Sequence, residues 1–151
     1  MPNSASTSAL PDLEVIARVL QSLGIRRGMV VNGKAGDSAM DELSTLGENT
    51  VAEFYQDRGF SVSRDDPNLF PLKPATLDDL KGGDAEENAA TIRAILAGED
   101  RGPRRDAVLL NAAHALFVAA RTKSAIEGWD LAASVIDDGL AKSKLAELTD
   151  D

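Results

Sequence analysis

The sequence predicts a helix-rich α/β fold with one buried parallel strand and one β-hairpin. Apolar residues recur at helical spacing in several segments, most of them in the second half of the chain. Residues 28–31 form a short apolar run that follows a helical segment, an order typical of parallel α/β sheets. Residues 50–55 and 60–63 have the composition of two strands joined by a short turn, which predicts the hairpin.

The first half of the chain divides into a tail, a helix, a strand and a long loop. Residues 1–9 are small and polar, so we expect a disordered tail before a folded part of residues 10–151. Apolar residues between positions 10 and 23 share one helical face, and Gly24 is a natural stop for that helix. The strand at 28–31 leads into residues 33–49, which contain few large apolar side chains. We expect a functional loop there, because long ordered loops in compact domains usually carry function.

The second half of the chain is predicted to be helical. Helices are expected at residues 77–80, 84–98, 102–120 and after 124, with a closing segment at 142–148. Capping boxes at 84–87 and 124–127 mark two of the starts. A parallel strand buried on both faces needs neighbouring strands, and the sequence supplies few. Either the fold is mostly helical, or part of the sheet lies in another chain.

Composition excludes several classes of function. A formal net charge of −9 repels phosphate backbones, which argues against a nucleic-acid partner. The absence of cysteine excludes disulfides, cysteine-zinc sites and thiol nucleophiles, and is consistent with a cytoplasmic location. No apolar run approaches the roughly 20 residues that span a bilayer, so no membrane association is expected.

Three carboxylates lie in the loop after the predicted strand, at Asp37, Asp41 and Glu42. Ligands of α/β sheets bind beyond the carboxyl ends of strands, and adjacent carboxylates offer the oxygen ligands that Mg²⁺ prefers. A divalent cation would also relieve the repulsion between Asp41 and Glu42. The spacing alone leaves two readings open: a metal site, or a solvated acidic loop.

Other polar and aromatic residues have structural readings. The single histidine, His114, lies on an apolar helix, where a packed side chain is more common than a catalytic one. Trp129 is expected in a core or an interface. Arg101, Arg104 and Arg105 form the one basic cluster, and either meet a phosphate or surround a solvated helix start.

Several segments, in this order and at this spacing, resemble the anthranilate phosphoribosyltransferase family. The segments are residues 30–33, 40–44, 47, 50–53, 80–89 and 106–113, and the resemblance covers roughly residues 10–148. It departs from the family at Asn32, where many relatives carry histidine, and at residues 34–40, which are longer than the usual link. Asp37 is therefore unmatched and is not assigned to the metal.

The resemblance implies an enzyme of tryptophan biosynthesis, a glycosyltransferase that moves phosphoribosyl from phosphoribosyl pyrophosphate to anthranilate. The Asp-Glu pair of this family binds the magnesium that accompanies the pyrophosphate, so Asp41 and Glu42 are the expected Mg²⁺ ligands. The metal would neutralise the leaving pyrophosphate. No catalytic side chain or other cofactor is assigned.

The resemblance also implies an incomplete phosphoribosyltransferase-type α/β domain. The family carries an N-terminal helical region and a glycine-rich pyrophosphate loop that have no match here. Residues 81–84 contain two glycines but begin a capped helix, so they are not that loop. We therefore expect the chain alone to be inactive, with an exposed sheet edge that pairs with an N-terminal half chain or with itself.

Other functions remain open from the sequence. The chain is alternatively a non-catalytic remnant, or an assembly or regulatory protein of the same fold. A nucleoside phosphorylase-like enzyme shares the broad architecture, but the context of the Asp-Glu pair favours the phosphoribosyltransferase. The net charge disfavours the related DNA-binding branch.

Overall fold

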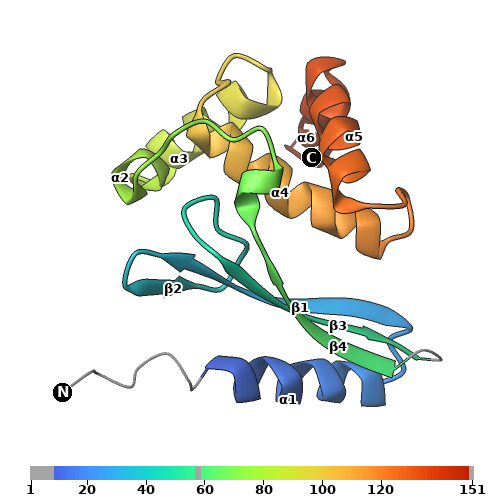
Figure 1. The fold of residues 1–151 in the computed structure, drawn as a ribbon. Coiled ribbons are helices and arrows are strands. Elements are labelled where there is room, and N and C mark those ends of the chain that lie inside the picture. The colour runs from blue at the N-terminus through green and yellow to red at the C-terminus, as the bar shows by residue number, and fades with distance from the viewer. Residues whose placement is uncertain (1–8, 57–58, 150–151) are drawn as a thin grey trace. The chain divides into compact units, whose positions relative to one another are not determined.

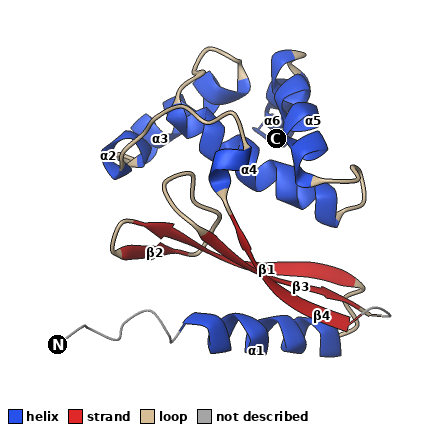
Figure 2. Ribbon diagram, in the orientation of Figure 1, coloured by secondary structure: helices blue, strands red, loops and turns tan. Residues whose placement is uncertain are grey.

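The computed structural model describes residues 9–56 and 59–149, which form two compact units divided after Leu69. The described part of the first unit combines one long helix with a four-stranded sheet, and that of the second is built from helices (Figures 1 and 2). The predicted helix-rich α/β composition is confirmed. The predicted tail of residues 1–9 lies outside the described residues, apart from Ala9 at the start of the first helix.

Helix α1 (Ala9–Ser22) covers one face of the sheet in the first unit. Leu13 and Ala17 point into this contact and pack with Ala52 and Phe54 of the sheet. The helix ends where predicted, because Gly24 adopts a φ of +88° that side chains with a Cβ rarely take. The amphipathic pattern of α1 therefore forms the core of this unit.

The sheet is antiparallel throughout and has the strand order β2-β1-β3-β4. Its strands are β1 (Arg27–Ala35), β2 (Ser38–Met40), β3 (Asn49–Tyr55) and β4 (Gly59–Asp65). The predicted hairpin is confirmed as the β3–β4 pair, in which Tyr55 lies opposite Gly59.

The described residues do not confirm the predicted parallel direction of β1, and the loop predicted after it is shorter than expected. The strand is not parallel to a neighbour: both β2 and β3 run antiparallel to it, and residues 27–32 are only partly buried. A short β-branched run is common to both kinds of sheet and does not encode strand direction. The expected loop at 33–49 is also shorter, because β1 continues to Ala35 and turns at Gly36 (φ +61°) into β2.

The second unit contains five described α-helices. They are α2 (Leu77–Leu80), α3 (Ala85–Leu96), α4 (Pro103–Val118), α5 (Ala125–Asp137) and α6 (Leu140–Thr149). Asp84 accepts a hydrogen bond from the Glu87 amide and Glu87 accepts one from the Asp84 amide, which confirms the capping box at α3. The positive φ of Gly139, +75°, separates α5 from α6.

Helices α4 and α5 make the most extensive contact of this unit. Gly128 lies so close to Ala113 that an added Cβ would stand 3.0 Å from its Cα and carbonyl carbon. This close approach allows Trp129 to be buried, with its ring centroid 5.4 Å from that of Phe70. None of the described helices is both long and apolar enough to cross a membrane.

Candidate metal site

Asp41 and Glu42 lie on the connection between β2 and β3, immediately after Met40. Both residues are exposed, whereas the next two, Leu43 and Ser44, are buried. The pair therefore stands at the point where the connection leaves the surface and enters the unit. The sequence placed it after the strand at 28–31, and the structure inserts β2 between that strand and the pair.

Asn32 fixes the backbone before the pair. It lies on β1, and its Nδ2 atom donates a hydrogen bond of 3.0 Å to the Met40 carbonyl. This bond holds the end of β2, where the β1–β2 ladder stops at the Gly33–Met40 pair. Asn32 thus stabilises the backbone conformation at the end of β2.

Asn49 fixes the backbone after the pair. Its Oδ1 atom accepts a hydrogen bond of 2.7 Å from the Ser44 amide, and its Nδ2 atom donates one of 3.0 Å to the Ser44 carbonyl. Both residues are only 1% exposed. The buried side-chain amide of Asn49 thus forms hydrogen bonds with both the N–H and the C=O of Ser44. Buried backbone groups need such partners, and no strand or helix supplies them at this position.

Gly33 and Gly47 bring the connection close to β1. A Cβ added at Gly33 would lie 2.5 Å from the Ser44 amide nitrogen and 2.6 Å from the Glu42 carbonyl oxygen. A Cβ added at Gly47 would lie 2.7 Å from the Lys34 carbonyl oxygen. The connection therefore packs on β1 through contacts that only glycine permits at these two positions.

The donor chemistry of this site fits a hard divalent cation. Asp41 and Glu42 present adjacent carboxylate oxygens to solvent, and neither forms a salt bridge with a residue that the structure describes. Within the described residues no group of three or more histidine, cysteine, aspartate or glutamate side chains is placed to hold a metal. The pair would thus supply part of a coordination shell, as is usual for Mg²⁺, which keeps waters or phosphate oxygens in its other positions.

A polar hollow of about 390 Å³ lies beside the same connection, within the first unit. Its lining includes Thr45, Glu48, Arg64 and Asp66, and an ion pair of 2.7 Å joins Arg64 to Glu48. The Thr45 hydroxyl is buried and has no hydrogen-bond partner among the described residues. None of these residues was singled out from the sequence, where they carry no motif.

Asp37 lies at the tip of the β1–β2 hairpin, in the two-residue turn after Ala35. It is exposed and separated from Asp41 by the length of β2. Residues 34–40 therefore form part of a hairpin, with Asp37 in its turn.

The arginines at the start of α4 form hydrogen bonds with residues of the second unit. Arg101 and Arg105 each donate a 2.9 Å hydrogen bond to the Asp137 carboxylate. Arg104 donates to the carbonyls of Asp79, at 3.1 Å, and Lys81, at 2.8 Å. The solvated reading fits Arg101, whose side chain is 62% exposed, but not Arg105, which is buried, and the phosphate reading stays a prediction.

Two ionisable groups at these contacts have shifted pKa values. The hydrogen bond from Arg105 lowers the pKa of Asp137. On the sheet, the Tyr55 hydroxyl donates a hydrogen bond of 2.5 Å to Glu53, which also pairs with Arg27 at 2.9 Å. The hydrogen bond to Glu53 raises the pKa of Tyr55. Both clusters stabilise local structure.

His114 is packed, as predicted. Its Nδ1 atom lies 2.9 Å from the Leu110 carbonyl oxygen, and its ring centroid lies 5.8 Å from that of Phe70. Trp129 is buried in the same unit, in line with its predicted place in a core. Neither aromatic side chain belongs to the candidate metal site.

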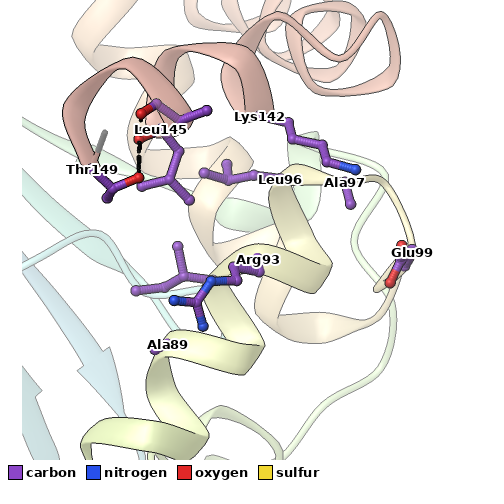
Figure 3. A pocket seen from close by; sticks show the side chains of 10 residues that line it. Ala89, Arg93, Leu96, Ala97, Glu99, Lys142, Leu145 and Thr149 are labelled. Carbon is purple, nitrogen blue, oxygen red and sulfur yellow. Dashed lines mark hydrogen bonds between the residues drawn. The ribbon is translucent and has the colours of Figure 1, made fainter. Parts of the chain in front are cut away.

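A second hollow, of about 530 Å³, lies between α3 and α6 (Figure 3). Its lining is mostly apolar, with Leu96 and Leu145 inside and Arg93, Glu99 and Lys142 among the polar residues. It contains none of the candidate metal ligands.

Comparison with known proteins decides the family. The model of the glycosyl transferase family, a/b domain, matches residues 6–142. The chain belongs to this glycosyl transferase family. Anthranilate phosphoribosyltransferase from a Geobacter species is 46% identical over 136 residues, a match that covers 90% of this chain and 37% of that protein.

Solved structures of this glycosyl transferase family share the fold. Anthranilate phosphoribosyltransferase from Thermus thermophilus is 40% identical with a TM-score of 0.75, over 91% of this chain and 39% of that one. The Saccharomyces cerevisiae enzyme in complex with PRPP and Mg is 24% identical with a TM-score of 0.70, over 81% of this chain and 34% of that one. The chain thus spans well under half the length of these relatives.

Proposed function

We propose that this chain supplies the C-terminal, magnesium-binding part of an anthranilate phosphoribosyltransferase. Asp41 and Glu42 hold the Mg²⁺ that accompanies phosphoribosyl pyrophosphate, and the product is phosphoribosylated anthranilate for tryptophan biosynthesis. The observation that carries the proposal is the adjacent, exposed carboxylate pair on a backbone pinned by Asn32 and Asn49. The same fold holds PRPP and Mg in the yeast relative, which supports the choice of ligand.

The pinned connection does the positioning in this proposal. Asn32 and Asn49 hold the backbone at Met40 and Ser44, so the intervening carboxylates point outward from a fixed frame. A bound Mg²⁺ would supply charge neutralisation at the leaving pyrophosphate. Reactions of this kind depend on positioning and electrostatics more than on a nucleophilic side chain. The chain's lack of cysteine is compatible with that chemistry.

The rest of the site comes from the N-terminal part of the family polypeptide. The chain covers 37% of the Geobacter relative, which supports a contribution of other parts of the family polypeptide to the site. We therefore expect the 151-residue chain to bind Mg²⁺ weakly and to give no turnover by itself.

Fragment complementation tests the function. The chain is mixed with the N-terminal part of the Geobacter enzyme, and loss of anthranilate fluorescence is followed with PRPP and Mg²⁺. The corresponding C-terminal part of the Geobacter enzyme serves as the positive control. Activity that requires both fragments and Mg²⁺ supports the proposal. If the control pair is active and this chain is not, the chain is the non-catalytic protein that the sequence left as the alternative.

A titration tests the two ligands. Mg²⁺ is added to the isolated chain, and the amide NMR signals of residues 41 and 42 are followed in the wild type and in the Asp41→Asn/Glu42→Gln variant. We expect shifts in the wild type and none in the variant. Asp37→Asn is the matched control, since it removes an exposed carboxylate from the neighbouring turn and should leave the titration unchanged. Equal curves for the wild type and the double variant would remove the assigned role.

A further inference from the structure

Asn32 is the only asparagine in the sequence that is followed by glycine. Glycine has no Cβ to shield its backbone nitrogen, and its backbone turns freely in an unfolded chain. The nitrogen of Gly33 can then approach the side-chain carbonyl carbon of Asn32 and displace its amide group. In the folded chain, however, both residues lie in β1 and belong to its ladders with β2 and β3.

The displacement needs no reactant other than water. The Gly33 nitrogen forms a bond to the Cγ atom of Asn32, the Cγ–Nδ2 bond breaks, and a five-membered succinimide ring closes. Ammonia leaves with the proton that the Gly33 nitrogen carried. Water then opens the ring at one of its two carbonyl carbons, which leaves an aspartate or an isoaspartate at position 32.

The attacking nitrogen is held by β2. The β1–β2 turn has two residues, so Ala35 and Ser38 form its hydrogen-bonded closing pair. Such pairs alternate along an antiparallel ladder, so Gly33 and Met40 form the next one. The amide of Lys34, which lies between them, donates on the opposite side, toward the chain that precedes β3. The Gly33 N–H is therefore directed at the Met40 carbonyl.

The group that would leave is held by the same carbonyl. The Nδ2 atom of Asn32 donates a hydrogen bond of 3.0 Å to the Met40 carbonyl oxygen. Asn32 also lies opposite Thr50 on β3, so both ladders fix the extended backbone at this point. Ring closure requires the peptide unit after Asn32 to rotate toward its side chain, and that rotation would break the pairing on both sides.

We propose that Asn32 is a site of spontaneous deamidation and that β2 controls the reaction through the Met40 carbonyl. While β2 is paired with β1, one carbonyl oxygen holds both the attacking nitrogen and the leaving amide. When β2 separates from β1, both groups are released together. The proposal concerns covalent chemistry within the chain and is independent of whether the chain binds Mg²⁺.

β2 is suited to open without unfolding of the rest of the unit. It has three residues, two of them exposed, and it lies at one edge of the described sheet with β1 as its single partner strand. Short, exposed elements with few contacts open locally at a lower free-energy cost than global unfolding. We therefore expect local opening of β2, rather than unfolding of the unit, to set the rate.

Both products weaken the end of β2. An aspartate at position 32 has no N–H to donate to the Met40 carbonyl, and an isoaspartate adds one carbon to the backbone of β1. The Asn32→Asp variant reproduces the first product. After correction for intrinsic rates, its Gly33 amide should exchange hydrogen roughly fivefold faster than that of the wild type, because one hydrogen bond is lost. Equal exchange would show that the Met40 carbonyl does not control this site.

The reaction is followed in the full chain at mildly alkaline pH, with and without guanidinium chloride. Peptide mapping by mass spectrometry locates the exchange of an amide for a carboxylate. Gly36→Val promotes the opening of β2, because Gly36 has a φ of +61° in the β1–β2 turn and the added side chain meets no other atoms within 4 Å. The strain then falls on the turn alone.

Gly24→Val is the matched control. Gly24 also has a positive φ, of +88°, and the same open surroundings in the first unit. It precedes β1, at the opposite end of that strand from β2. The two variants therefore carry the same strained residue type, and only Gly36→Val acts on the pairing of β2.

We expect the folded wild type to deamidate at least roughly tenfold more slowly at Asn32 than the unfolded chain. Folded Gly36→Val should react roughly tenfold faster than Gly24→Val, which should react like the wild type. If Gly36→Val does not fold, the wild type still tests the proposal in denaturant concentrations below the unfolding transition. Opening of β2 exposes little surface, so the rate should rise only slightly there.

Three results would overturn the proposal. The first is a folded wild type that reacts as fast as the unfolded chain, or an unfolded chain that does not react at Asn32. The second is a folded Gly36→Val variant that reacts no faster than Gly24→Val. The third is a wild-type rate that rises with denaturant as steeply as global unfolding does, because β2 would then not open by itself.

Discussion

Replacement of Asn49 by alanine tests whether one side chain fixes the loop that carries Asp41 and Glu42. The substitution removes both hydrogen bonds to Ser44, of 2.7 and 3.0 Å, from a site that is 1% exposed. A buried backbone group left without a partner costs about 1–3 kcal/mol, so two such groups cost about 2–6 kcal/mol. Water admitted to the space of the lost amide offsets part of this cost, and we expect about 2–3 kcal/mol.

Urea unfolding followed by circular dichroism measures this loss. With an m-value of about 1–3 kcal/mol per molar urea, the Asn49→Ala midpoint should fall by roughly 1 M. Faster hydrogen exchange at the Ser44 amide should accompany it. Asn68→Ala is the control, because Asn68 is exposed and bonds only within its own turn, so its effect should stay within about 0.5 kcal/mol. Equal midpoints for the two variants would refute the role given to Asn49.

Two further predictions concern the helical unit. Gly128→Ala should lower the melting temperature, because the added Cβ would meet the backbone of Ala113 at a cost of about 1–3 kcal/mol. Helix propensity alone predicts that alanine raises the melting temperature. An unchanged or higher melting temperature would therefore contradict the close contact. The hydrogen bond from Arg105 lowers the pKa of Asp137 in the folded protein. The ion pairs of Asp137 therefore stabilise the protein fully at pH values above its ordinary pKa of 3.8. This stabilisation is lost as the pH falls through the pKa of Asp137 in the folded protein. As the pH is lowered from above 3.8, the melting temperature should fall less steeply for Asp137→Asn than for the wild type. Parallel curves of melting temperature against pH would show that the ion pairs of Asp137 contribute nothing to stability.

Features with local signals were predictable from the sequence. Helix α1 stops at Gly24, α3 begins at the Asp84 capping box, and the β3–β4 hairpin forms where predicted. Each depends on residues within a few positions of one another, through caps, turns and periodicity. The carboxylate pair carries a local signal of the same kind, since its two members are adjacent, and its metal role stays a prediction.

Features that depend on distant partners were not predictable. The direction of β1 is set by its pairing with β2 and β3, and its apolar run fits either kind of sheet. Arg105 pairs with Asp137, which lies 32 positions away. Residues 36–37 do carry the signal of a two-residue turn, but the short strand after them has no alternating pattern to strengthen it. Asn49 was likewise an ordinary polar residue until its contact with Ser44 was known.

The hydrogen bonds of Asn32 and Asn49 also determine when the loop loses its conformational freedom. Ordering a backbone costs about 1–2 kcal/mol per residue, and this chain meets that cost during folding, before any cation arrives. The affinity of the pair for a cation would then be set by hydration and charge, with little entropy lost by the protein. A loop ordered in advance also holds two like charges together in the empty state, so the unliganded protein retains a repulsion that a cation relieves.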